Sequence, residues 1–382
     1  MVEQRIPFFR PTIEDDDIEA VAGALRSGWL TTAGNARAFE AELAEHCGAP
    51  FVAVMNSATA ALHLALEAWG IGPGDEVITT PYTFCATANV VLHTGADVVF
   101  ADVRERDFNI DPERIAAAIT PRTKAIIPVH FAGEPCAMDE ILALARPRGI
   151  MVLEDAAHAI GALYRGRTIG SIADATAFSF YATKNMTTGE GGALASFDEQ
   201  FSERVRKLTL HGMSRDALRR YEAGGSWRYD VEEIGFKDNL TDTAAALGRS
   251  QLRKLGQLQD GRTSAVERYF ANLRDEERLI LPSVDEENRS AWHLFVVRVR
   301  EGAGVGRDEV IRRMTEAGIG TSVHFIPVHT FSAYQRLGRW KIGDFPVAER
   351  LFAGAISLPL FPSMTAAEVD DVCDVLRAAL RA

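Results

Sequence analysis

The chain has 382 residues, of which 47% are hydrophobic and 25% charged, and its 53 acidic and 41 basic side chains give a net charge of −12. The apolar fraction supports a large buried core and excludes general disorder, and the length suits two domains. The acidic balance argues against a nucleic-acid partner, because phosphate binding requires a basic face.

Residues 50–200 alternate short apolar runs with helical stretches. In chain order, strands are expected at 51–55, 76–79, 97–101, 124–130 and 150–154, and helices at 58–69, 84–93, 112–119 and 138–146. Asp111 followed by Pro112 is typical of a helix start. Strands that are apolar on both faces and separated by helices predict a largely parallel sheet with crossover connections.

The pattern changes after about residue 240. A long helix is expected from Thr241 to about Asp275, and a last helix begins where Thr365 and Glu368 have capping-box spacing. Between them, strands are expected at 278–282, 293–300 and 320–325, with a helix at 308–317. We expect two domains: residues 1–245, which include an N-terminal arm, and a smaller α+β domain of residues 246–382.

No stretch predicts a membrane span or a signal peptide. The uncharged stretch 77–96 contains Pro81, Asn89, His93 and five threonines, which are unsuited to a bilayer. The four cysteines have neither CxxC nor metal-ligand spacing, so we expect buried thiols and no metal site. These features predict a cytoplasmic protein without a membrane partner.

Small residues follow the first predicted strand. The stretch 56–61 reads Asn-Ser-Ala-Thr-Ala-Ala, so it leaves the start of the next helix bare. The free N–H groups and positive end of such a helix can hold a phosphate, with Ser57 and Thr59 as further donors. The alternative is that Ser57 is an ordinary helix N-cap.

An acidic pair closes the predicted strand 150–154 and is followed by small residues and His158. A carboxylate at this strand end, Asp155, would suit a ligand cation such as a protonated ring nitrogen. The alternative is a helix cap with a solvated neighbour.

Lys184 is the only lysine between Lys124 and Lys207. It lies between an aromatic run, 177–181, and a glycine-rich bend, 188–192. Partial desolvation there would lower the pKa of its amine and make it available for imine formation. The alternative is a solvated surface charge.

Together, a phosphate seat, an acid for a pyridinium nitrogen and a lysine 29 residues after that acid predict a pyridoxal phosphate (PLP) site. At this point the chain resembles the DegT/StrS group of fold-type I nucleotide-sugar aminotransferases. The resemblance runs through GWLTTAG, NSATAALHLAL, GPGDEVITTPYTFCATAN, PVHFAGEP, EDAAHAIGA, FSFYATKNMTTGEGG, IGFKDNLTDTAAALG and SLPLFPSMT. It implies an α/β fold with a large, mixed, mostly parallel seven-stranded sheet flanked by helices, and a smaller C-terminal α+β domain.

The resemblance implies a role for each matching residue. Lys184 would bind the cofactor as a Schiff base and move the substrate proton, while Asp155 would keep the pyridine nitrogen protonated. Phe84 would stack on the ring, and His158 would lie near the ring or its phenolic oxygen. The phosphate would be held at Ser57, Ala58, Thr59 and Ser179, and Asn239 would reach the phosphate of a neighbouring subunit. A homodimer with shared active sites, or a higher oligomer, is therefore expected.

The resemblance also indicates the substrates. Residues 210–216 and 221–229 resemble the loop of enzymes that act at C4 of 4-keto-6-deoxyhexoses, and 321–329 is similar to their sugar-side wall. Arg215, Arg228 and Lys237 are candidates for the nucleotide diphosphate, and His324 and His329 for the sugar, although a structural histidine is the alternative. Expected partners are L-glutamate and an NDP-ketosugar, such as dTDP-4-keto-6-deoxyglucose, in deoxyaminosugar and antibiotic biosynthesis.

Three other functions remain open. A C3-ketosugar or a keto-inositol could replace the C4 acceptor, and a regulatory protein could bind PLP without turnover. Relatives that carry histidine in place of the lysine are sugar 3-dehydratases, so Lys184 favours transamination. An enzyme is therefore the main expectation.

Overall fold

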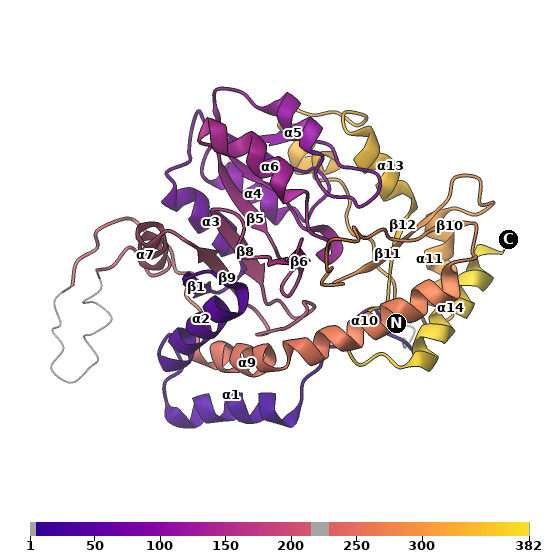
Figure 1. Ribbon diagram of the computed structural model, residues 1–382, viewed down its shortest axis with the longest axis horizontal. Coiled ribbons are helices and arrows are strands. Elements are labelled where there is room, and N and C mark those ends of the chain that lie inside the picture. The colour runs from indigo at the N-terminus through magenta and orange to yellow at the C-terminus, as the bar shows by residue number, and fades with distance from the viewer. Residues whose placement is uncertain (1–4, 215–228, 382) are drawn as a thin grey trace.

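The computed structural model describes residues 5–214 and 229–381, and its largest element is a seven-stranded sheet (Figure 1). The strand order is β1 (Phe51–Met55), β9 (Gly192–Ser196), β8 (Ala175–Ser179), β5 (Met151–Asp155), β4 (Thr123–Ile127), β2 (Glu76–Thr79) and β3 (Asp97–Phe100). β9 runs antiparallel to both of its neighbours, and the other strands share one direction. The predicted mixed, mostly parallel sheet is confirmed.

Alternation along the strands builds a core on each face of this sheet. In β1, Ala53 and Met55 pack against one set of helices, whereas Val52 and Val54 pack against the other. The first set is α3 (Ala58–Ala68), α4 (Ala86–His93) and α7 (Glu199–Leu208). The second is α2 (Gly34–Cys47), α5 (Pro112–Ala118) and α6 (Met138–Ala145). Two-sided burial explains why most of the strands are apolar throughout.

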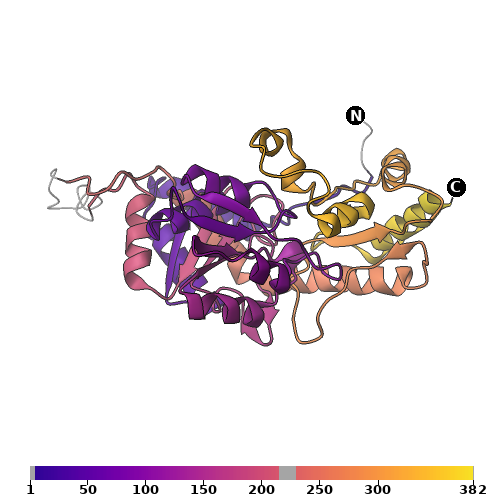
Figure 2. The ribbon, with the colours of Figure 1, turned by 90° about the horizontal axis from the view of Figure 1, so that it is seen from above.

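A second, antiparallel sheet comprises β10 (Leu279–Ile280), β11 (Phe295–Val299) and β12 (Ala355–Leu358). A third core joins it to α10 (Leu255–Leu273), α11 (Arg307–Glu316) and α14 (Ala366–Leu380). The remaining elements are α12 (Ser332–Arg336), α13 (Pro346–Gly354), the hairpin β6 (Leu163–Tyr164) and β7 (Arg167–Thr168), and three short 3₁₀ turns, Phe131–Gly133, Arg146–Arg148 and Val328–Thr330. Seen from above, α10 extends from the large sheet to the small one (Figure 2).

The N-terminal segment contacts both parts of the molecule. Ile6 exchanges backbone hydrogen bonds with Gly318 and Gly320 and packs in the third core. Farther along, α1 (Asp15–Ser27) packs on α9 (Asp242–Arg253) beside the large sheet. No helix in the described part of the chain has the length and apolarity of a bilayer span.

Two element predictions are wrong. The long helix from Thr241 is interrupted at Lys254, whose backbone leaves the helical region and whose ammonium group binds the carboxylates of Glu14, Asp16 and Asp17. The expected strand 320–325 makes only an isolated bridge, between Ser322 and Ser357. The predicted N-cap at Asp111 and the capping box at Thr365 are confirmed. The boundary at residue 245 lies within α9 and stays a prediction.

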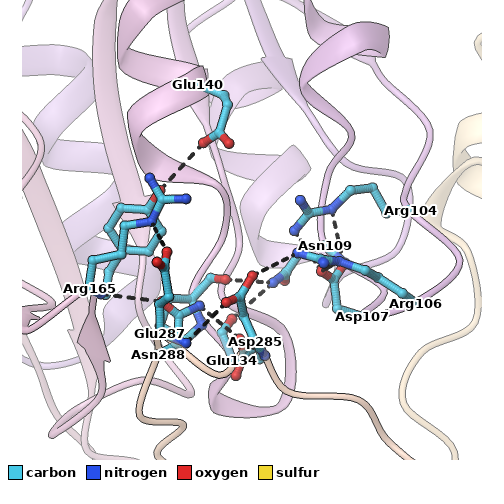
Figure 3. Close-up of polar contacts among 12 residues, drawn as sticks. Arg104, Arg106, Asp107, Asn109, Glu134, Glu140, Arg165, Asp285, Glu287 and Asn288 are labelled. Carbon is cyan, nitrogen blue, oxygen red and sulfur yellow. Dashed lines mark hydrogen bonds and ion pairs between the residues drawn. The ribbon is translucent and has the colours of Figure 1, made fainter.

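A polar cluster connects the segment after β3 to the segment before β11 (Figure 3). This Glu134 cluster consists of Arg106, Asp107, Glu134, Asp285 and Asn288. Arg106 is 3.1 Å from a carboxylate oxygen of both Asp107 and Asp285, and Asn288 donates to Glu134 Oε1 at 2.9 Å. The other oxygen of Glu134, Oε2, is buried without a hydrogen-bond partner among the described residues.

Candidate active site

A cavity of about 750 Å³ lies at the ends of β5 and β8, beside the start of α3. Eight of the residues selected for the cofactor from the sequence line it: Ser57, Ala58, Thr59, Phe84, Asp155, His158, Ser179 and Lys184. His324, selected for the sugar, also lies on its wall. Residues distant in the sequence therefore converge because the carboxyl ends of parallel strands share one edge of the sheet.

Asp155 is the last residue of β5 and is buried. Thr87 Oγ1 donates to its Oδ2 at 2.8 Å, and the Ala157 N–H donates to its Oδ1 at 3.2 Å. Burial raises the pKa of the carboxyl group, and these hydrogen bonds together with the charge of Lys184 oppose the rise. A carboxylate fixed in this way can hold a proton on a bound cationic nitrogen.

Lys184 lies in the turn after β8, where its backbone N–H donates to Tyr181 O at 2.9 Å. Its side chain lines the cavity. Burial lowers the pKa of its amine to about 8, and the charge of Asp155 acts in the opposite direction. The structure disfavours the solvated-surface alternative, because Lys184 lines the cavity and a carboxylate lies near enough to affect the pKa of its amine. A lysine with a lowered pKa is a nucleophile near neutral pH.

The first turn of α3 lies on the cavity wall. Ser57 Oγ accepts from Ala60 N at 3.1 Å, so this hydroxyl is a helix N-cap, whereas the N–H groups of Ala58 and Thr59 belong to the end without intrahelical partners. Gly192 packs directly beneath: a Cβ there would lie 2.4 Å from Ser57 C and 2.5 Å from Ala58 N. Because Gly192 pairs with Ser179 between β8 and β9, the Ser179 hydroxyl lies beside this helix start. This arrangement suits an anion.

Aromatic and imidazole rings form another wall. Phe84 is 60% exposed, and its ring centroid is 6.2 Å from that of Phe325. The rings of His158 and Phe325 stack at 5.8 Å. His324 Nδ1 lies 2.8 Å from Ser357 Oγ; burial, then the charge of Lys184, lowers the pKa of His324 to about 4.

Several of the selected residues do not line the cavity. Asn239 donates to Thr32 Oγ1 at 2.7 Å, and Lys237 contacts Asn239 Oδ1. His329 is buried, with its Nε2 2.9 Å from Glu349, so the structure favours the structural alternative for it. Arg215 and Arg228 lie outside the described residues.

Other residues that line the cavity or support its wall were not selected from the sequence. Thr87 holds Asp155, Gly192 supports the start of α3, and His293, Phe8 and Phe9 lie on the wall. Thr87 is the last residue of the TFCAT stretch and lies within the predicted helix 84–93, and the paired glycines 191–192 are a signal that could have indicated a close approach. Nothing local marks Phe8, Phe9 or His293, because a long-range connection brings each to the site.

The residues present fit PLP: a helix start for a phosphate, a buried carboxylate for a ring nitrogen, an amine with a lowered pKa and an exposed aromatic ring share one cavity. His158 adds a buried Nδ1 without a hydrogen-bond partner among the described residues. Each chemical part of the cofactor therefore has a counterpart on the wall.

Comparisons with known proteins agree with this fit. The model of the DegT/DnrJ/EryC1/StrS aminotransferase family matches residues 11–377. The spore coat polysaccharide biosynthesis protein SpsC of Bacillus subtilis is 50% identical over 382 residues, which cover 99% of this chain and 98% of SpsC. The solved structure of Spr1654 from Streptococcus pneumoniae in its PMP form, assigned as a sugar aminotransferase, has a TM-score of 0.93 at 35% identity, with 98% of this chain and 99% of that one covered.

A further structure is PseC of Helicobacter pylori, an aminotransferase involved in the biosynthesis of pseudoaminic acid. Its TM-score is 0.91 at 29% identity, with 98% of this chain and 99% of PseC covered. The lysine, the acid and the phosphate seat stand in a fold that matches these proteins over almost its full length. The chain therefore belongs to the DegT/DnrJ/EryC1/StrS aminotransferase family, and it is a PLP-dependent sugar aminotransferase.

Proposed function

We propose that the protein transfers the amino group of L-glutamate to C4 of an NDP-4-keto-6-deoxyhexose, dTDP-4-keto-6-deoxyglucose in the first instance, giving an NDP-4-amino-4,6-dideoxyhexose. The observation that carries the proposal is the Lys184 amine with its lowered pKa, on one cavity with Asp155 and the start of α3. The similarity of residues 321–329 to the sugar-side wall of C4 aminotransferases supports the choice of acceptor.

In this proposal the cofactor is held at both ends. The Ala58 and Thr59 N–H groups and the Ser179 hydroxyl bind the phosphate, Asp155 binds the ring nitrogen, and Phe84 and His158 contact the ring. PLP, when bound, supplies an aldehyde that takes up amino groups and a protonated ring that withdraws electrons from the adjoining carbon. Thr87, through its hydrogen bond, keeps Asp155 in place for this contact.

Lys184 moves the proton. With PLP and glutamate bound, the free amine of Lys184 would accept the α-proton of glutamate and would return a proton on the cofactor side. The same amine would carry out the reverse transfer when the keto sugar is the second substrate. The reaction is ping-pong because the keto acid formed from glutamate leaves before the keto sugar binds. A pKa of about 8 suits both directions near neutral pH.

The cavity wall supports a deoxysugar acceptor. Leu360, Phe8 and Phe325 offer an apolar surface for a methyl group at C6, and His324 offers an imidazole to the sugar oxygens. Arg215, Arg228 and Lys237 remain the candidates for the nucleotide diphosphate. The roles of SpsC in spore coat polysaccharide biosynthesis and of PseC in pseudoaminic acid biosynthesis support an aminosugar product for glycan assembly, with antibiotic sugars as the other destination.

We further propose a homodimer with shared sites in the cytoplasm. Asn239 lies off its own cavity and binds Thr32. The nearby Trp29 and Leu30 are 53% and 50% exposed, which suits burial by a second copy. All four cysteines are free, which is compatible with a reducing compartment.

Two measurements test the proposal. Borohydride reduction with peptide mapping must place the cofactor on Lys184, and Lys184→Ala must lose at least about 10²-fold in turnover, since general base catalysis contributes roughly 10²–10⁴-fold. Steady-state kinetics with 3-keto and 4-keto nucleotide sugars must favour the 4-keto substrate. Selective amination of a 3-keto sugar or a keto-inositol would refute the C4 assignment but leave the cofactor site intact.

A further inference from the structure

Two imidazole rings meet on the cavity wall. His158 follows β5 and His293 precedes β11, and their ring centroids are 4.3 Å apart at an interplanar angle of 39°. Both residues are buried and both line the cavity. His158 has a proposed contact with the cofactor, whereas His293 has no role in the function described above.

Asn185, the neighbour of Lys184, fixes the tautomer of His293. Its Nδ2 donates to Ala291 O at 2.5 Å and lies 3.4 Å from Gln259 Oε1, so its amide orientation is determined by two oxygen acceptors. Asn185 Oδ1 therefore faces His293 Nδ1, at 3.0 Å. Because an amide oxygen only accepts, His293 Nδ1 carries the hydrogen and its Nε2 the lone pair.

His158 has the opposite tautomer. Its Nδ1 is buried without a hydrogen-bond partner among the described residues, and a buried N–H without an acceptor is rarer than a buried lone pair. The hydrogen therefore belongs on Nε2, which is the nitrogen that can donate a hydrogen bond into the cavity. An unpartnered Nδ1 cannot hold the ring in place, so its orientation depends on packing.

The surroundings keep both rings neutral. Burial is the main cause that places the pKa of each well below the usual histidine value. Among the groups that face His293, Lys184 and Arg262 carry positive charges that disfavour a further cation, and His158 and His324 would do so only when protonated. Lys184 disfavours a cation on His158 in the same way.

We propose that His293 is a positioning residue: Asn185 fixes its tautomer, and its ring packs against His158 and orients His158 Nε2–H toward the cofactor. The inference rests on the proposed contact of His158 with the cofactor. It adds a second layer to the site, in which the residue after the reactive lysine acts through His293 on the ring that follows the neighbouring strand β5.

The test separates the ring of His293 from its hydrogen bond. His293→Phe keeps the ring and loses the donor, His293→Asn keeps a donor and loses the ring, and His293→Leu loses both. Full-length protein labelled with ¹⁵N-histidine reports the tautomer of His158 before PLP is added, so this readout is independent of turnover. After PLP is added, its absorption band gives the Kd for PLP and the pH at which the change in the band is half complete. His63→Leu is the control, because His63 lies outside the cavity.

We expect wild-type His158 to show a protonated Nε2 and a bare Nδ1. In His293→Leu, His158 should show mixed tautomers, the pH midpoint of the absorption band should shift, and Kd should rise about three- to tenfold, the effect of one hydrogen bond. His293→Phe and His293→Asn should show smaller changes. His63→Leu should match the wild type.

A folded His293→Leu protein with unchanged His158 signals and an unchanged pH midpoint would overturn the inference. If His293→Leu does not fold, Asn185→Leu replaces it, because this variant removes the hydrogen bond that fixes the tautomer of His293. The same His158 signals and pH midpoint are then measured. If His158→Gln leaves PLP binding unchanged, the proposed cofactor contact of His158 fails, while the tautomer signals of the cofactor-free protein still decide the role of His293.

Discussion

Two opposing effects set the charge of the Lys184 amine. Burial in the cavity lowers its pKa to about 8, and the negative charge of Asp155 raises it. Because burial outweighs the charge of Asp155, roughly a fifth of the amine is neutral at about pH 7.4, far more than for a solvated lysine, and the neutral amine is the nucleophile. The same carboxylate thus limits how far the lysine is activated and is available to hold a proton on the ring.

The capture of added PLP by cofactor-free protein should therefore rise with pH, with a midpoint near 8. Only the neutral amine attacks the aldehyde, so the rate follows its fraction. In Asp155→Asn the midpoint should move below that of the wild type, because the charge that raises the lysine pKa is removed. Stopped-flow absorbance measures both rates, and a wild-type midpoint near the ordinary lysine value would contradict the proposed environment.

Eight of the candidates selected from the sequence lie on one cavity, because each directly flanks a buried strand or a helix start. A strand end is a local signal, and the sheet then assembles those ends. This explanation does not apply to Asn239, Lys237 and His329. His329 follows a segment that forms no regular strand, and its ring binds Glu349 instead. Asn239 and Lys237 lie in a connection that forms only isolated bridges, to Met55 and Leu210, and their side chains contact Thr32 and each other.

At the scale of elements, the contact of β9 with the start of α3 sets the phosphate seat. Gly192→Ala would place a methyl group 2.4 Å from Ser57 C. Backbone must move to relieve this contact, so we expect a loss of about 1–3 kcal/mol in unfolding free energy and weaker PLP binding. Denaturant unfolding and PLP titration measure the two effects.

Gly256→Ala is the matched control, because Gly256 lies in α10 and nothing stands within 4 Å of its added Cβ. It should leave PLP affinity unchanged and not reduce stability. Equal PLP affinities for Gly192→Ala and the wild type would show that β9 does not shape the seat.

The Glu134 cluster should make stability depend on pH (Figure 3). Burial, together with the charges of Asp107 and Asp285, raises the pKa of Glu134 from 4.5 to about 7, against the hydrogen bonds from Asn288 and Asp285 N. The folded state therefore binds this proton more tightly than the unfolded chain does. The contribution of Glu134 to stability is present below pH 4.5 and is lost as the pH rises to about 7.

Glu134→Gln removes the cost of ionising a buried carboxyl group. It keeps a side-chain oxygen that can accept a hydrogen bond from Asn288. At pH 8 the variant should be more stable than the wild type by up to about 3 kcal/mol, and the advantage should disappear toward pH 5. Urea unfolding at the two pH values measures it. An advantage that is the same at both values would show that the carboxyl group does not titrate in this range.

The strands and helices were predicted correctly where the hydrophobic pattern of the segment reflects one uniform pattern of burial along its length. Strands buried on both faces and helices with clear caps were found. The break at Lys254 was missed because it depends on three carboxylates of the distant segment 14–17. The strand expected at 320–325 was wrong because this segment crosses the cavity, where His324 and Phe325 face the site instead of a neighbouring strand.

For the whole molecule, the main question is whether one chain makes a complete site. Four large apolar side chains of α1 and the segment after it are exposed: Ile18, Leu25, Trp29 and Leu30. The segment is tied to the region of Asn239, because Asp242 N–H donates to Leu30 O and Asn239 donates to Thr32. An apolar surface continuous with a polar residue that lies off its own cavity is suited to an isologous dimer.

Complementation between two inactive variants tests this arrangement. In a mixed dimer of Lys184→Ala and Asn239→Ala subunits, shared sites leave one site with both native residues, because Lys184 comes from one subunit and Asn239 from its partner. Random reassembly of equal amounts should then restore roughly a quarter of wild-type activity. If Asn239 served its own subunit, each site would carry a defect and no activity would return. The mixture is made by unfolding and refolding the two proteins together, light scattering gives its mass, and each variant refolded alone gives the baseline.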